Sequence, residues 1–535
     1  MMQTNSLLLY NGKIHTMNQA NPLVSALLIR NGVILFAGDD TSAQQVAGAA
    51  GIRDKIDLKG AAVLPGLTDA HLHFEYISLG LDAINAEKPT KAAVLADVAA
   101  MAAEKPAGAW ITGYGWNHNV WDAKFPTAAE LDAVSPNHPV FLEAKSGHAA
   151  WVNTVALKLA GLTAASPDPA GGELVRKPNG EPEGTLLEEA VGLVKDLIPK
   201  PDVPELMVAA RRAMAQAHRA GLTGVHDMDT PLIFAVEQAL RQAGELTLRI
   251  TKSIPLVHLD EALAVGLRTG FGDDMLRVGA VKMFADGALG PRTAWMLEGF
   301  DSAPENTGIA TTDIEVLRES VFKANGGGLA CAIHAIGDRA NREILDIYEQ
   351  AIEKGLTGSL RNRIEHVQLL APEDIGRLGE LNVVASMQPL HATSDMDIST
   401  EHWGKRSANA YALKSQLQHG AVLALGSDCP VETWDPLVGI HAAVTRRRPD
   451  GTPGPEGWYP EQRLSVHEAV QGYTTGPAYA AGMEDRLGML KVGFLADCVV
   501  LDKDIFEIAP MEILNTKVLG TLVNGTFVYR DPELV

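Results

Sequence analysis

Hydrophobic positions in the middle of the chain follow two alternating patterns. Short apolar runs, which predict buried strands, are separated by stretches in which apolar residues recur every three or four positions, as on one face of a helix. One such stretch, NREILDIYEQAIEKG, has apolar residues at 344, 345, 348 and 352. Eight strand–helix units predict an α/β fold, a closed (β/α)8 TIM barrel of parallel strands. The strand candidates are AAVLPGLTDAHLH, GLTGVHDMD, TLRITKSIPL, RVGAVKMFADG, GLACAIHAIGD, RNRIEHVQLL, NVVASMQPL and GAVLALGSDCP.

The two ends of the chain have a different pattern. SLLLYNGKIHTM and SALLIRNGVILFAGD each carry an Asn-Gly pair between β-rich halves, which predicts two hairpins. The C-terminal segments ADCVVLDKD and VLGTLVNGTFVYRD repeat this pattern. We therefore expect one small β-unit built from both termini.

A long interval interrupts the barrel pattern. About 140 residues separate the first predicted strand from the second, and they contain Trp110, Trp116, Trp121 and Trp151. We interpret this interval as an insertion over the C-terminal mouth of the barrel. The predicted domains are residues 1–63 and 486–535 for the two parts of the terminal β-unit, and 64–485 for the barrel, with the insertion at about 76–205.

Composition narrows the classes of partner. The 535 residues include 45 Lys and Arg against 66 Asp and Glu, a net charge of −21. Nucleic acid and anionic membranes bind clustered positive charge, so we expect neither as a partner. We expect a small molecule as the substrate. The three cysteines show no CxxC spacing, and the sequence shows no signal peptide or run of ~20 apolar residues. These features predict a cytoplasmic protein without a disulfide framework.

Side chains of metal-binding types stand where the predicted strands end. Since catalytic residues of parallel barrels lie at the carboxyl ends of the strands, we expect these side chains to meet at one mouth. His71 and His73 are two residues apart and so share one face of a strand, as ligands of one ion would. A metal site is therefore predicted from the set His71, His73, Lys282, His334, His366 and Asp428.

Each residue also has a structural interpretation. A single histidine on an apolar strand is usually a core residue with satisfied hydrogen bonds. Lys282 cannot coordinate a cation as an ammonium, and it either pairs with Asp286 or loses its proton on desolvation. The free amine reacts with CO2, and the carbamate so formed has two oxygens that can bridge two metals. Ligand types at five strand ends favour the metal interpretation.

The motifs together resemble a known family. PGLTDAHLH, VKMFADGALGPRTA, AIHAIGDRAN, RIEHVQ and GSDCPVETWDP are similar to those of the metal-dependent amidohydrolase superfamily, in its YtcJ-like branch, which includes N-substituted formamide deformylases. NGKIHTM, GYGWNHNVWD, KVGFLADCVVLDKD and TLVNGTFVYR extend the resemblance over nearly the whole chain. It implies a barrel flanked by a β-sandwich from the two termini, and a homodimer is the expected assembly.

The resemblance also implies a site with one or two divalent ions, usually zinc. His71 and His73 would bind the more buried ion, and His334 and His366 the second. A carboxylated Lys282 would bridge the two, and Asp428 would contact metal and transfer protons. Iron, manganese and cobalt stay open, because the same nitrogen and oxygen ligands accept them.

The reaction expected from this site is hydrolysis of a non-peptide C–N bond, such as that of an N-substituted amide or formamide. A metal-activated hydroxide would attack, with Asp428 as general base and then acid. Deamination and the opening of a cyclic amide or lactone use the same hydroxide and stay open. A non-enzymatic alternative is a metal-binding protein that has lost turnover, whose expected signature, a missing Asp428 or a broken HxH, is not found.

Further residues are candidates for contacting substrate or orienting ligands. Asp338 and Glu365 could orient ligands, and Trp121 could cover the pocket, whereas Cys429 is interpreted as a packing residue. For the tryptophans, core packing is the competing interpretation. The candidates for substrate contact or ligand support are Trp116, His226, Asp286, Arg292, Gln388 and His391.

Overall fold

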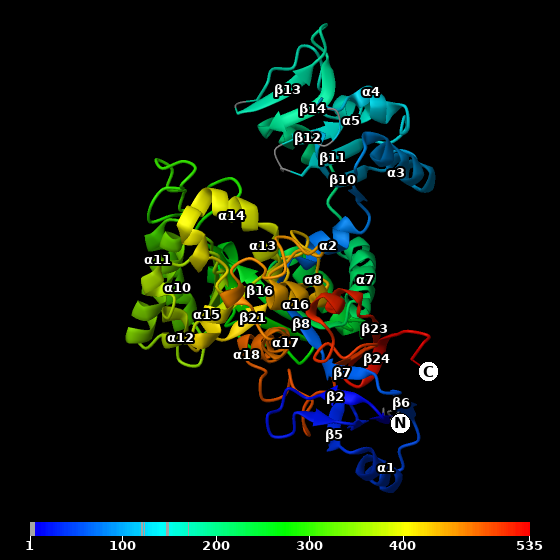
Figure 1. The fold of residues 1–535 in the computed structure, drawn as a ribbon. Coiled ribbons are helices and arrows are strands. Elements are labelled where there is room, and N and C mark those ends of the chain that lie inside the picture. Colours follow the sequence, from blue (N-terminus) through cyan, green and yellow to red (C-terminus); the bar gives the residue numbers. More distant parts are fainter. Residues whose placement is uncertain (1–5, 119–120, 122–123, 146–148, 170, 535) are drawn as a thin grey trace. The chain divides into compact units, whose positions relative to one another are not determined.

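Eight parallel strands form the sheet around which the larger part of the molecule is built (Figure 1). The computed structural model describes residues 6–118, 121, 124–145, 149–169 and 171–534. Neighbours in the sheet follow one another in the chain, and every predicted strand run contributes one strand, so the predicted TIM barrel is confirmed. The strands are β8 (Leu67–Leu72), β15 (Leu222–Asp227), β16 (Arg249–Pro255), β17 (Leu276–Phe284), β18 (Ala330–Ala335), β19 (Arg363–His366), β20 (Val384–Met387) and β21 (Leu423–Leu425).

The first and last strands meet just beyond the end of β21. The backbone N–H of Asp428 donates to the carbonyl of His71 at 2.7 Å, and that of Ser427 donates to the Asp69 carboxylate at 3.1 Å. At Gly426 a Cβ would lie 2.6 Å from both the Asp69 carboxylate and the His71 nitrogen. A side chain would therefore push apart the two strand ends that carry His71 and Asp428.

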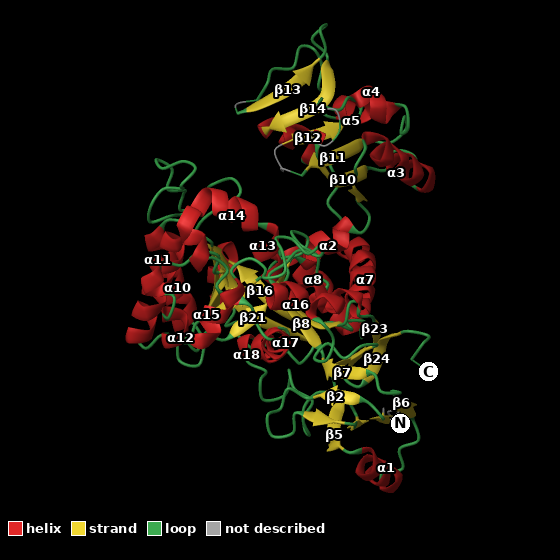
Figure 2. Cartoon of the chain, in the orientation of Figure 1, coloured by secondary structure: helices red, strands yellow, loops and turns green. Residues whose placement is uncertain are grey.

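Helices follow the strands and lie outside them (Figure 2). The stretch predicted as a helix lies in α11 (Asp338–Glu353) except for its last two residues, and Ile344, Leu345 and Tyr348 of this helix are buried. The other helices of this part are α7 (Val203–Arg219), α8 (Pro231–Ala243), α9 (Leu259–Ala264), α10 (Ile314–Gly326), α12 (Arg377–Glu380), α13 (Pro389–Ser394), α14 (Met396–Trp403), α15 (Leu413–Gln418), α16 (Pro436–Thr445), α17 (Val466–Gly472) and α18 (Thr475–Ala480).

The two termini together form a β-sandwich, as predicted. Apolar residues of both sheets make one core, which includes Leu9, Ile29, Val63, Val500 and Leu522. One sheet has the order β5-β4-β1-β6, with β5 (Val33–Gly38), β4 (Ala26–Arg30), β1 (Ser6–Tyr10) and β6 (Lys55–Asp57). The other has the order β24-β23-β22-β7-β2-β3, with β24 (Thr526–Arg530), β23 (Val518–Val523), β22 (Cys498–Leu501), β7 (Ala62–Pro65), β2 (Lys13–His15) and β3 (Leu23–Val24). Helix α1 (Asp40–Ala49) packs on the first sheet.

One of the two predicted N-terminal hairpins is wrong. Asn31-Gly32 joins the antiparallel pair β4 and β5, both residues having positive φ, as a tight hairpin turn requires. Asn11-Gly12 instead joins β1 to β2, which belong to different sheets. The local turn signal is the same, but the apolar residues on either side of Asn11 are buried in strands that pair with other partners.

The first predicted strand run divides into two strands. β7 pairs with β22 in the sandwich, and β8 begins the barrel two residues later. The break falls at Gly66, where a Cβ would approach the Thr223 side chain to 2.2 Å. The predicted domain boundaries themselves stay a prediction.

The chain forms two compact units: a barrel unit (Met1–Glu75 with Ala210–Val535) and an insertion unit (Tyr76–Ala209). The insertion unit has its own mixed sheet, and Trp116 and Trp151 are buried in its core. That the insertion covers the barrel mouth stays a prediction. The strands of this sheet, in order, are β13 (Gly172–Arg176), β14 (Pro182–Glu188), β12 (Ala149–Val152), β11 (Val140–Ala144), β10 (Ile111–Trp116) and β9 (Ile84–Asn85). The helices of the insertion unit are α3 (Lys91–Glu104), α4 (Ala128–Asp132), α5 (Thr154–Leu159) and α6 (Gly192–Lys195), and α2 (Phe74–Gly80) and α7 span the boundary between the units.

Cys331, Cys429 and Cys498 are all buried, and none of them forms a disulfide among the described residues. Within the same residues, no helix combines the length and the apolar character needed to cross a membrane.

Candidate metal centre

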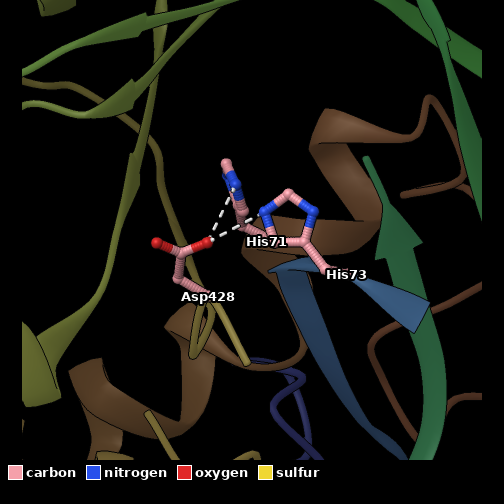
Figure 3. A group of neighbouring side chains, drawn as sticks. All are labelled: His71, His73 and Asp428. Atoms are coloured by element: carbon pink, nitrogen blue, oxygen red, sulfur yellow. Dashed lines mark ion pairs between the residues drawn. The ribbon is translucent and has the colours of Figure 1, made fainter. Parts of the chain in front are cut away.

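Two imidazoles and one carboxylate converge where β8 and β21 end. Figure 3 shows the rings of His71 and His73 turned toward the carboxylate of Asp428. The Nε2 atom of His71 lies 3.4 Å, and that of His73 3.3 Å, from Asp428 Oδ1. One ligand atom from each of the three lies within 4.8 Å of the others. Because side chains two residues apart on a strand point the same way, both histidines face the same carboxylate. Ligands that share one ion must converge in this way.

Each of the two imidazoles is backed by a further carboxylate. His71 Nδ1 is 2.5 Å from Glu365 Oε2, and His73 Nδ1 is 2.6 Å from Asp229 Oδ1. When the ring is neutral, a carboxylate bound to Nδ1 keeps the proton on that nitrogen, which leaves the Nε2 lone pair for an ion. This arrangement is typical of histidines that ligate metal.

A second group shares Asp428 and includes His366 and His391. His366 ends β19, and its Nδ1 lies 2.9 Å from the Gln388 side-chain oxygen. His391 Nε2 lies 3.7 Å from Asp428 Oδ2 and forms no hydrogen bond with any residue that the structure describes. His366 and Asp428 have positive φ values of 76° and 61°, conformations that L-residues adopt at a cost and that cluster at functional sites.

His334 lies beside His366 but outside both groups. Their ring centroids are 4.6 Å apart, and His334 Nε2 donates to the carbonyl of Gly287 at 2.8 Å. This leaves Nδ1 as the nitrogen with which His334 could ligate. Asp286, the partner considered for Lys282, accepts backbone N–H groups of Trp295, Ile336 and Gly337 instead.

Lys282 is buried beside His71. Its Nζ lies 3.3 Å from His71 Nε2 and 5.0 Å from the centre of the Phe284 ring. Among the described residues it forms no ion pair with Asp286. Burial lowers the pKa of Lys282 from its ordinary value, which favours the neutral amine.

Burial keeps most of these imidazoles neutral. Burial and the charge of Lys282 lower the pKa of His71 and that of His334 to about 4. Burial by itself also lowers the pKa of His73, but bonds to Asp229 and Asp428 outweigh it and raise the pKa to about 9. Burial raises the pKa of Asp428, yet the bond from His73 and the nearby imidazoles hold it well below the usual range. An anionic carboxylate therefore faces neutral nitrogen ligands and one imidazolium.

Comparison with known proteins decides the family. A model of the amidohydrolase family matches residues 54–529. The chain belongs to the amidohydrolase family. Membership makes it a hydrolase of carbon–nitrogen bonds, as its sequence predicts.

Three relatives match this amidohydrolase over nearly its whole length. The N-substituted formamide deformylase of Arthrobacter pascens is 28% identical over 99% of each chain. The putative amidohydrolase YtcJ of Bacillus subtilis is 31% identical, covering 97% of this chain and 99% of its own. Protein LONG AFTER FAR-RED 3 of Arabidopsis thaliana is 34% identical, and the match covers 98% of this chain and 91% of the relative. A solved structure of a metal-dependent hydrolase from Pyrococcus horikoshii superposes on this chain with a TM-score of 0.79 at 28% sequence identity. The match covers 94% of this chain and 99% of the hydrolase.

The candidates for substrate contact fall in different parts of the amidohydrolase. Gln388 and His391 lie at the site. His226 is buried and hydrogen-bonded to Arg363 at 2.8 Å, a structural contact. Arg292 has an exposed side chain in a turn, and among the described residues it forms no hydrogen bond or ion pair with the ligand candidates.

The substrate role of Trp116 is wrong. Its indole is 1% exposed within the core of the insertion unit, where Nε1 donates to the carbonyl of Leu142 at 2.7 Å. The competing interpretation, core packing, holds. Trp121 packs against the same core, and Cys429 is buried, as expected of a packing residue.

Three buried residues near the site are missing from the sequence prediction. Asp229 supports His73, Lys252 supports the loop that carries Asp229, and Arg363 binds Glu365. Asp229 follows β15, so the rule that found the other site residues applies to it as well. Lys252 and Arg363 lie inside strands, where sequence alone does not reveal what a charged side chain contacts.

Proposed function

We propose that this amidohydrolase cleaves a linear, non-peptide C–N bond, that of an N-substituted amide or formamide, at a divalent metal centre. The proposed ligands are His71, His73, Lys282, His334, His366 and Asp428. The observation that carries the proposal is the convergence of His71, His73 and Asp428 with a carboxylate behind each imidazole. A single core histidine also needs a hydrogen-bond partner, but two carboxylate-backed imidazoles that face one shared carboxylate are typical of a metal site.

The residues present fit a divalent ion. Imidazole nitrogens and a carboxylate oxygen, three per group, are the donors that zinc and related ions prefer. The neutral state of His71, His334 and His366 suits ligation, because a protonated ring cannot bind a cation. The same donors accept several first-row metals, and zinc is our first choice because it is the usual ion of the resembling family.

When bound, the ion would supply a water of lowered pKa and polarise the carbonyl of the substrate. Asp428 would accept the proton of that water and deliver it to the leaving nitrogen, so that the amine departs neutral. Its position suits both transfers, since one oxygen faces the HxH pair and the other faces His391.

Lys282 is proposed to carry a carboxylate. Its neutral amine would attack CO2, forming an N–C bond and releasing one proton, and the carbamate would supply two oxygens and one negative charge. Burial and the proximity of His71 Nε2, 3.3 Å away, support this role. An unmodified ammonium at that distance would instead repel a cation.

Two buried polar atoms at the site make no hydrogen bond to the residues that the structure describes. They are the Nε2 atoms of Gln388 and His391, and leaving such atoms unsatisfied costs free energy in the folded protein. Both belong to the segment that follows β20. We propose that the Gln388 amide donates to an oxygen of the substrate and that His391 faces the same molecule.

Deamination and cyclic-amide or lactone hydrolysis are the alternatives on this scaffold. They share Asp428 and the histidines, so a substrate panel decides among them. We expect purified enzyme to release formate or another acid and a free amine from N-alkyl or N-aryl amides. Ammonia release from aminopurines, or turnover of cyclic amides and lactones alone, would contradict the proposed bond. No turnover by metal-replete enzyme on any of them would contradict hydrolysis of these classes.

A further inference from the structure

One carboxylate holds both His73 and the backbone beyond it. Asp229 Oδ1 lies 2.6 Å from His73 Nδ1, and Oδ2 accepts the backbone N–H of Glu75 at 2.7 Å. The Asp229 side chain is 1% exposed, so water does not compete for these bonds. The position of the His73 ring is thereby tied to the chain two residues further on.

Asp227 and Lys252 fix the position of the loop that carries Asp229. The Asp227 carboxylate accepts the backbone N–H groups of Asp229 at 3.1 Å and Phe74 at 3.3 Å. Lys252, on the neighbouring strand, binds Asp227 Oδ2 at 2.6 Å and the Asp229 carbonyl at 2.7 Å. Lys252 and Asp227 have fully buried side chains, so the ammonium compensates the buried negative charge here.

We propose that Asp229, held by Lys252 and Asp227, is a positioning residue for His73. It fixes the ring with Nε2 toward Asp428 and thereby sets the affinity of the centre for its metal. This inference rests on the proposed function, because His73 is positioned here as a ligand.

The chemistry of the two contacts explains why a carboxylate is required. When His73 is neutral and ligating through Nε2, its Nδ1–H and the Glu75 N–H are both donors. Asp229 offers an acceptor oxygen to each. An asparagine has one oxygen and one NH2 group, so it can satisfy only one of the two. If its NH2 faces His73, the ring must present the Nδ1 lone pair and carry its proton on Nε2, which prevents ligation there.

Zinc affinity tests the proposal directly, without a substrate. Metal-free protein is titrated with zinc against a chromophoric chelator, for the parent, Asp229→Asn, Asp229→Glu and Asp374→Asn. Asp374 is a matched control, because it is a buried aspartate that pairs with Arg342 at 2.8 Å and contacts none of the proposed ligands. Circular dichroism establishes that each variant is folded.

We expect Asp229→Asn to bind zinc about 10- to 100-fold more weakly than the parent. Asp374→Asn should match the parent, and Asp229→Glu, which restores two acceptor oxygens, should recover part of the loss. Parent-like affinity in Asp229→Asn would overturn the proposal, as would equal losses in Asp229→Asn and Asp374→Asn. If Asp229→Asn does not fold, Asp229→Glu serves as the test, because its carboxylate is displaced by one methylene. Parental zinc affinity in a folded Asp229→Glu variant would then overturn the proposal. A parent that binds no zinc would instead contradict the proposed function.

Discussion

At the scale of single residues, Asp428 joins the two groups of imidazoles. It faces His71 and His73 with one oxygen and His391 with the other. Its backbone is held in a left-handed conformation by the bond from its N–H to the His71 carbonyl. The same residue closes the barrel and is the proposed proton acceptor, and such a double role would account for a strained backbone at this position.

Substitution of Asp428 should separate catalysis from folding. Asp428→Asn keeps the shape and the backbone bond but removes the base, so we expect kcat to fall by about 10²- to 10⁴-fold. The melting temperature should change little. Steady-state kinetics on whichever amide the panel identifies, with thermal melting alongside, measures both. Retention of parental kcat would contradict the role of Asp428.

Metal affinity should depend on pH through His73. In the metal-free protein its pKa is about 9, so near neutral pH a metal must displace one proton from the ring. Apparent zinc affinity should therefore weaken by about tenfold for each pH unit below 9. Chelator competition between pH 6.5 and 8.5 measures this, and affinity that does not vary with pH would contradict it.

The bonds from His73 to Asp229 and Asp428 also affect the stability of the metal-free protein. Because the folded-state pKa of His73 is raised above its ordinary 6.5, this stabilisation is fully present below pH 6.5 and is lost as pH rises through about 9.

At the scale of helices and strands, the barrel could be predicted because its strands are buried on both faces. Such strands appear in the sequence as continuous apolar runs. Because a helix separates each strand from the next, neighbouring strands are expected to be parallel. Asn11-Gly12 could not be placed, because a turn signal is local whereas the sheet that each flanking strand joins depends on distant partners. In the same way, HxH spacing identifies His71 and His73, but Asp229 supports His73 only through a contact across 156 residues.

Trp116 belongs to the core of β10 and its neighbours. Trp116→Ala removes a buried indole, so we expect it to destabilise the insertion unit by about 3–5 kcal/mol, and Trp116→Phe by less. The zinc content of the barrel unit should not change. Thermal unfolding and metal analysis test this. A stable Trp116→Ala variant with an altered KM would restore the substrate role.

At the scale of the whole barrel unit, the two ends of the chain complete the sandwich and bind the start of the barrel. Arg249, at the beginning of β16, donates to both oxygens of Asp497 at 2.5 and 2.7 Å and to Asn524 at 2.6 Å. This buried ion pair ties β16 to β22 and to the β23–β24 turn, at the end of the barrel opposite the site.

Breaking that pair should affect stability and not chemistry. Asp497→Ala leaves the Arg249 guanidinium buried without its partner, and we expect a loss of about 3–5 kcal/mol in the free energy of unfolding. Zinc affinity should stay at the parental value. Urea unfolding and zinc titration measure the two, and a fall in zinc affinity without loss of stability would contradict this assignment.

The proposed function depends on a metal centre to which Lys282 contributes a carbamate. The most direct measurement is metal content per chain, by mass spectrometry of elements, in parent and Lys282→Ala protein purified without chelator. We expect about two ions in the parent, as a carbamate-bridged pair requires, and one or fewer in the variant. One ion in both would give Lys282 a structural role and favour the deaminase alternative. No metal in either, even after reconstitution, would contradict the metal centre altogether.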